Sequence, residues 1–230
     1  MARPSGSDWI VSEAKRMKFD DLVHVEVGTG ENSKAYAIYS STLTTRSLFF
    51  RKALSGPWKE IEERVVHLPE DDVRAFDLYL HYIYNKEFTC SPSDDQYGEE
   101  ERGTLVRLYV LCEKLQDPKS KNCIIKALSG SIYKIRSNGN WNILESAVVE
   151  ILYKGTFKGS PVRRMLFDIF AQGVPSNFAT ADWTNKYPEE FLQDLAVSLM
   201  TTFDLDVRRA APLPREGKVV AYLEKEEQVE

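Results

Sequence analysis

Short segments near the start of the chain alternate apolar and polar residues, as half-buried strands do. In residues 22–27, three valines occupy every second position, while His24 and Glu26 fall between them. A second strand-like segment follows at residues 34–39, after a turn-rich break at 28–33. The pattern therefore predicts a β-hairpin with the valines on its buried face.

From residue 40 onward, apolar residues mostly recur at intervals of three or four, which indicates amphipathic helices. The exception is a short apolar strand predicted at residues 65–68. Ser47 stands where it can cap a helix, and Pro69 to Asp72 supplies proline and acidic residues where another helix begins. We expect helices at about residues 40–46, 47–54, 73–83, 105–115, 121–133, 141–153, 161–171 and 188–203.

The same periodicity predicts which side chains face the interior. Cys112 lies on the apolar stripe of residues 105–115, so we expect it to be a small core residue. The buried face expected for the helix after Asp72 consists of Val73, Phe76, Leu80 and Ile83.

Three stretches lack such a pattern. Residues 1–17 form an N-terminal segment in which a short helix can carry Trp9 and Ile10. Residues 90–103 are polar and predict a mobile loop, and residues 204–230 combine prolines with an acidic run and predict a disordered tail. Early strands followed by many helices predict the α+β class.

Several residues on these elements follow a family-specific spacing. The residues that carry it are Asp21-Leu22-Val23-His24-Val25, then Leu43, Ser47 and Phe50, then Val66-His67-Leu68-Pro69, then Phe76, Leu80 and Tyr82-Ile83-Tyr84, and finally 105–115 and 122–128. With the order of the elements, they resemble a BTB/POZ domain over residues 18–130. Tyr39 departs from the family pattern, which usually has histidine there.

The resemblance implies a BTB/POZ fold, in which a small sheet is flanked by helical hairpins. Residues 131–203, with Ser160-Pro161-Val162-Arg163-Arg164, are similar to the all-helical extensions of BTB proteins from filamentous fungi. The expected organisation is therefore an N-terminal segment, a BTB/POZ domain, a helical extension and an acidic tail.

Composition and charge narrow the class of protein. The chain has 230 residues, 30 basic and 35 acidic, and a net charge of −5, whereas sequence-independent nucleic-acid binding needs clustered positive charge. No apolar run approaches the ~20 residues of a membrane-spanning helix, and the N-terminus lacks the apolar stretch of a secretory signal. We expect an intracellular protein, in the cytoplasm, the nucleus or both, that binds neither nucleic acid nor membranes.

No motif of a known catalytic chemistry is present. The chain lacks a Gly-x-Ser-x-Gly nucleophile motif and a glycine-rich phosphate loop, and Gly28-Thr29-Gly30 suits a hairpin turn instead. The histidines and cysteines do not have the spacing of metal ligands: His24, His67, His81, Cys90, Cys112 and Cys123. We expect no enzyme activity, no cofactor and no metal, and an enzyme stays a remote alternative.

The polar loop before the predicted strand at 65–68 contains one candidate for partner binding. Trp58, Lys59 and Glu60 follow Gly56-Pro57 in a polar segment, where a tryptophan packs on its own chain or meets a partner. The triplet fits the hydrophobic-x-Glu pattern that several cullin-binding BTB adaptors carry in this loop. The resemblance gives Trp58 the role of apolar anchor and Glu60 the role of shaping the loop.

These observations predict a non-catalytic protein–protein interaction module. The most concrete version is a substrate adaptor for a cullin-type E3 ubiquitin ligase, with an unknown substrate. The alternative is a self-associating structural scaffold or transcription-related BTB protein, and the choice between monomer and homodimer stays open.

Overall fold

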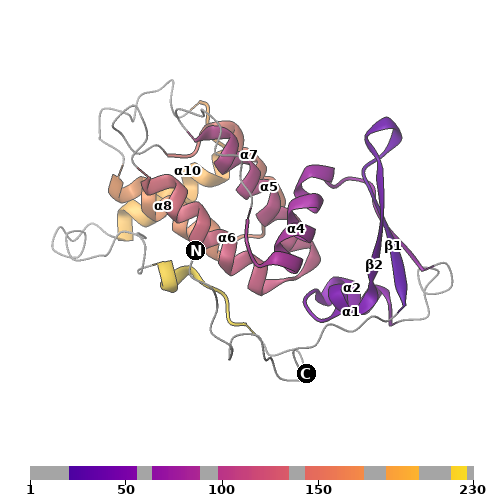
Figure 1. Cartoon of the computed structure of the whole chain (residues 1–230). Helices are drawn as coiled ribbons and strands as arrows, with labels where there is room; N and C mark the ends of the chain where they lie inside the picture. The colour runs from indigo at the N-terminus through magenta and orange to yellow at the C-terminus, as the bar shows by residue number, and fades with distance from the viewer. Residues whose placement is uncertain are drawn as a thin grey trace. The chain divides into compact units, whose positions relative to one another are not determined.

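The computed structural model describes residues 21–55, 64–88, 98–134, 143–173, 185–201 and 219–226. The chain forms two compact units, Met1–Glu70 and Asp71–Glu230, which we call the sheet unit and the helical unit. Figure 1 shows the strands of the first unit and the helices of the second. The small sheet and the many helices confirm the predicted α+β class.

The sheet unit contains the predicted hairpin. β1 (Leu22–Val27) pairs antiparallel with β2 (Lys34–Tyr39), and β3 (Val65–Leu68) pairs parallel with the other edge of β1. The strand order is β2-β1-β3. The three valines of β1 are buried and His24 and Glu26 are exposed, as the alternation predicted.

A helical hairpin lies between β2 and β3 along the chain. It consists of α1 (Ser40–Thr44) and α2 (Leu48–Ala53). The Ser47 hydroxyl accepts a hydrogen bond from the Phe50 backbone N–H at 3.1 Å, which confirms its predicted role as a cap. Leu43 and Phe50 are fully buried, so the spacing of these three residues serves packing and capping.

The helical unit is built around one long helix. α5 (Glu99–Leu115) packs against α4 (Val73–Asn85), α6 (Pro118–Tyr133) and α7 (Ser146–Gly155). α8 (Pro161–Gly173) and α10 (Glu189–Thr201) pack on each other, and the short 3-10 helix η5 (Val219–Tyr222) lies against α6 and α8 (Figure 1). Cys112 is buried in α5, as expected for a core residue.

The buried face of α4 is rotated from the predicted one. Phe76 and Ile83 are buried as expected, but Val73 and Leu80 are only partly buried, and Tyr79 is completely buried instead. The Tyr79 hydroxyl donates a hydrogen bond to the buried carboxylate of Asp117, so the tyrosine can be buried without losing a partner. The periodicity of apolar residues does not predict such a polar contact.

Two polar segments are ordered where the sequence pattern predicted loop or disorder. The first turn of α5 begins at Glu99, inside the expected loop at 90–103, because three successive glutamates are favourable at a helix N-terminus. Within the expected tail, 204–230, the described residues 219–226 are ordered because Val219 and Tyr222 are buried against the helices. Residues 1–17 and the remaining parts of both segments lie outside the described residues.

Two expected boundaries also differ. The division expected between residues 130 and 131 falls inside α6, a continuous helix that reaches Tyr133. α7 begins at Ser146 rather than near Trp141, which lies outside the described residues. In the segments that the structure describes, no helix is both long and apolar enough to cross a bilayer.

Candidate functional site

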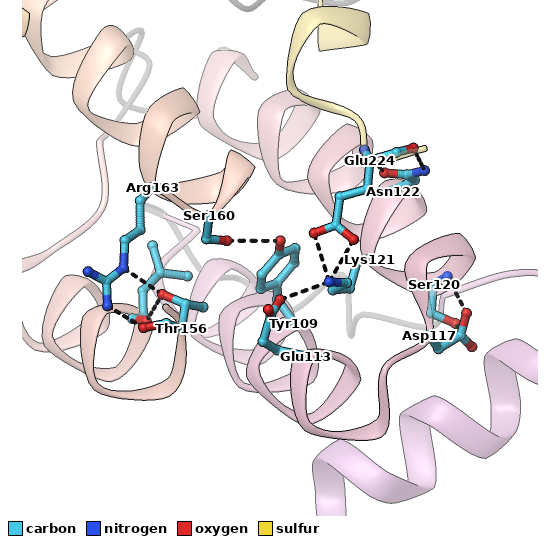
Figure 2. Close-up of polar contacts among 11 residues, drawn as sticks. Tyr109, Glu113, Asp117, Ser120, Lys121, Asn122, Thr156, Ser160, Arg163 and Glu224 are labelled. Atoms are coloured by element: carbon cyan, nitrogen blue, oxygen red, sulfur yellow. Dashed lines mark hydrogen bonds and ion pairs between the residues drawn. The ribbon is translucent and has the colours of Figure 1, made fainter. Parts of the chain in front are cut away.

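Polar side chains, of which Lys121, Asn122 and Ser198 are buried, gather in the helical unit where the C-terminal segment meets α6 and α8. Figure 2 shows how this segment, Val219–Glu226, approaches Lys121 and Asn122 in the first turns of α6. We call the groups that receive it the tail site. They are Glu113 on α5, Lys121 and Asn122 on α6, Arg164 and Asp168 on α8, and Ser198 on α10.

Lys121 provides the central charge of the tail site. Its Nζ lies 3.0 Å from the Glu113 carboxylate and 2.7 Å from the Glu224 carboxylate, and its side chain is only 8% exposed (Figure 2). Burial raises the pKa of Glu113, and the attraction of Lys121 opposes that rise. One buried cation thus holds two carboxylates, one from the helices and one from the C-terminal segment.

Asn122 binds the main chain of the segment. Its Nδ2 donates to the Glu224 carbonyl at 2.9 Å, and the Glu224 backbone N–H donates to its Oδ1 at 2.7 Å. The same Nδ2 also donates to the Glu226 carboxylate at 3.0 Å. A side-chain amide that satisfies both backbone groups of one residue imitates a neighbouring β-strand, so it recognises extended backbone whatever the side chain.

Tyr222 anchors the other end of the segment. Its hydroxyl donates to Asp168 Oδ2 at 2.9 Å, and the Arg164 guanidinium lies 5.9 Å from the centre of its ring. Ser198 donates to the other oxygen of Asp168 at 3.3 Å. Burial raises the pKa of Asp168, and burial together with this neighbouring carboxylate raises the pKa of the Tyr222 hydroxyl.

A second polar cluster, centred on Arg163, holds together the helices that carry part of the tail site. The Arg163 guanidinium, almost fully buried, donates to Thr156 Oγ1 at 2.8 Å, to Glu190 at 2.7 Å, and to the carbonyl oxygens of Tyr153 and Thr156. Nearby, the Tyr109 hydroxyl and the Ser160 hydroxyl lie 3.4 Å apart (Figure 2). These contacts join α5, α7, α8 and α10, and thereby hold the helices that carry Arg164, Asp168 and Ser198.

The residues expected to bind a partner are not placed by the structure. Trp58, Lys59 and Glu60 all lie outside the described residues, as does Cys90. The partner-binding role of the triplet therefore stays a prediction.

The described histidines are dispersed. His67 Nδ1 lies 3.1 Å from the Glu26 carboxylate across the sheet, with both side chains more than half exposed, and this pair lines an open hollow of about 410 Å³ beside Gly28 and Lys34. His81 contacts Asn85 on the exposed side of α4. Over the described part of the chain, no three His, Cys, Asp or Glu residues come together as a metal site would require.

Sequence reasoning missed the tail site. Lys121 and Asn122 look like ordinary solvent-facing residues at the start of a helix, and Glu224 belongs to an acidic run that suggested disorder. The one available signal was the apolar stretch Val219-Val220-Ala221-Tyr222-Leu223 within that polar tail, since a disordered segment rarely carries such a cluster.

The tail site combines three kinds of recognition, for a carboxylate, for both backbone groups of one residue and for a phenol hydroxyl, each through hydrogen bonds. The sequence matches no protein-family model, and no curated protein matches it significantly.

Proposed function

We propose that this chain is a non-catalytic protein–protein interaction module of the BTB/POZ type. The observation that carries the proposal is the order of elements in the sheet unit, where a β-hairpin leads through a capped helical hairpin to a strand parallel to β1. Leu43, Ser47 and Phe50 occupy the core and the cap of that hairpin. Packing and capping are the roles that the helical spacing of these residues predicts, and the same residues carry the family resemblance.

The specific activity that we propose is that of a substrate adaptor for a cullin-type ubiquitin ligase. Trp58 would provide the apolar anchor and Glu60 would shape the loop around it, as the hydrophobic-x-Glu pattern implies. The helical extension or the tail would recruit a second protein. Two binding surfaces on one chain raise the effective concentration of a substrate near the ligase, and this mechanism needs no reaction centre.

Binding to the N-terminal region of a cullin tests this function directly. We expect the full chain to bind it, and the double substitution Trp58→Ala and Glu60→Ala to weaken the affinity by roughly 30-fold or more, as the loss of an interface hot spot does. A matched control is Phe157→Ala, which removes an aromatic ring that is 58% exposed from the helical unit. This control should bind as the wild type does.

Two outcomes would contradict the adaptor function. One is absence of binding by the wild type, and the other is unchanged binding by the double variant. Light scattering over a range of concentrations then separates the alternative, because a self-associating scaffold has a mass above 26.3 kDa that rises with concentration. A chain that forms homodimers but does not bind the cullin would favour the scaffold.

A further inference from the structure

We propose that the tail site is a peptide-binding site that the chain's own residues Val219–Glu226 occupy in this structure. Its ligand class is a short acidic peptide with a tyrosine two residues before a glutamate, as Tyr222 at the end of the 3-10 helix η5 and Glu224 after it are arranged. Such a peptide can bind from another molecule when the C-terminal segment leaves. This inference is independent of the proposed cullin function, because it concerns only the helical unit.

The polar contacts of the segment are of the kind that a protein uses to bind a peptide. Asn122 pairs with both backbone groups of Glu224, at 2.9 and 2.7 Å, as a strand added to a sheet edge would. Val219 and Tyr222 are the buried side chains of η5, while Val220 is 65% exposed. Two anchors and a main-chain clamp therefore hold the segment, and its buried Val219 and Tyr222 side chains add apolar contacts to these polar ones.

The side chains of the tail site define the ligand. Asp168 accepts from the Tyr222 hydroxyl at 2.9 Å and Arg164 faces its ring, so the first position selects tyrosine over phenylalanine. Lys121, 2.7 Å from the Glu224 carboxylate, selects an acidic residue at the second position.

The tail site keeps internal partners when the segment leaves. Lys121 retains the Glu113 carboxylate at 3.0 Å, and Asp168 retains the Ser198 hydroxyl at 3.3 Å. Release of the segment therefore leaves neither Lys121 nor Asp168 without a partner. A buried charge without a partner would oppose opening of the site. A site that remains paired in the empty state is preorganised for a ligand.

The covalent link between α10 and the C-terminal segment explains why the chain's own segment occupies the tail site. Residues 202–218 separate the end of α10 from the segment, so the segment is tethered near its own site. A tether of such length gives an effective concentration on the order of millimolar. A free peptide must compete with this concentration, so the site becomes available only when docking of the segment is weakened.

The test uses the full chain with Tyr222→Ala and Glu224→Lys, which remove both recognition contacts of the tethered segment. The probe is a fluorescent synthetic peptide with the wild-type sequence of residues 219–226, and its binding is followed by anisotropy. We expect saturable binding to this double variant. Binding to the wild-type chain should be about tenfold weaker or more, because the tethered segment competes.

Two controls locate the bound peptide. Adding Asn122→Leu to the double variant should weaken binding at least about tenfold, whereas Lys126→Leu, at an exposed position one turn further along α6, should not. No binding to a double variant with wild-type circular dichroism, or equal binding to the double variant and the wild type, would overturn the proposal.

A measurement on the wild-type chain keeps the proposal testable if the variants do not fold. The Glu224 backbone N–H, bonded to Asn122 in the docked state, should exchange with deuterium through release of the segment alone. Its exchange should therefore be faster than that of Ile125 in α6, and nearly independent of low denaturant concentrations. Exchange of both amides at one common rate would mean that the segment leaves only with global unfolding, and would refute the proposal.

Discussion

The hydroxyl of Tyr79 on α4 donates to the carboxylate of Asp117 at 3.2 Å, and both side chains are fully buried. The same carboxylate caps α6, because it accepts from the Ser120 backbone N–H at 2.9 Å and from the Ser120 hydroxyl at 2.7 Å. One acidic residue thus ends the turn after α5, starts α6 and ties α4 to both.

Replacing Asp117 with alanine should destabilise the helical unit strongly. The substitution removes an N-cap and the acceptor of a buried hydroxyl, so we expect the free energy of unfolding to fall by about 2–4 kcal/mol in chemical denaturation. Tyr79→Phe removes only the hydroxyl and should cost about 1 kcal/mol. Equal losses for the two variants would contradict this assignment of roles.

Gly155, the last residue of α7, lies close to α5. A Cβ added there would meet three carbon atoms of the Val110 side chain at less than 3.0 Å. Gly155→Ala should therefore lower the free energy of unfolding by about 1–3 kcal/mol through overpacking.

Gly130 in α6 is the matched control, since a Cβ added there meets nothing within 4 Å. Gly130→Ala should raise the free energy of unfolding by about 0.5–1 kcal/mol, because alanine favours a helix interior. Thermal unfolding of both variants measures the contrast, and a stabilising Gly155→Ala would show that the two helices do not approach so closely.

The guanidinium of Arg163 supports α7 and α10 by its shape as well as its charge. Lysine keeps the charge but cannot reach Thr156, Glu190 and the Tyr153 carbonyl together, so Arg163→Lys should cost about 2–4 kcal/mol of unfolding free energy. The exposed pair of Lys154 with Glu150 offers a contrast, and Lys154→Gln should cost at most about 0.5 kcal/mol. Urea denaturation compares the two, and similar losses would argue against the buried cluster.

Stability should depend on pH through Glu113. Its pKa is raised by burial above the ordinary value of 4.5, so the folded chain binds this proton more tightly than the unfolded chain. The stability that protonation contributes is fully present below the unfolded pKa, and it is lost as pH rises through the raised pKa.

Glu113→Gln removes this titration. The unfolding free energy of the wild type minus that of the variant should therefore decrease as pH rises from about 4.5 through the raised pKa. Denaturation curves at several pH values in that window measure the difference. A difference that increases with pH would contradict the direction of the shift.

Local pattern was enough to predict most helices and strands. Alternating valines marked β1, and the serine at position 47 marked the start of α2, because strand alternation and capping depend on neighbours in the chain. The buried face of α4 was predicted less well. The preference for Tyr79 over Leu80 depends on Asp117, 38 residues away, and no local period records a distant acceptor.

The sequence by itself determined the α+β class, the order of the elements and the apolar positions that face inward, because these follow from periodicity and from capping within a few residues. Only the tertiary structure decided that the C-terminal segment is ordered and that Asn122 holds the backbone of Glu224, 102 residues further along. The physical reason is that a polar side chain becomes part of a binding site only when the path of the chain brings it a partner. The sequence near Asn122 gives no indication that it binds Glu224, and the sequence near Glu224 gives none either.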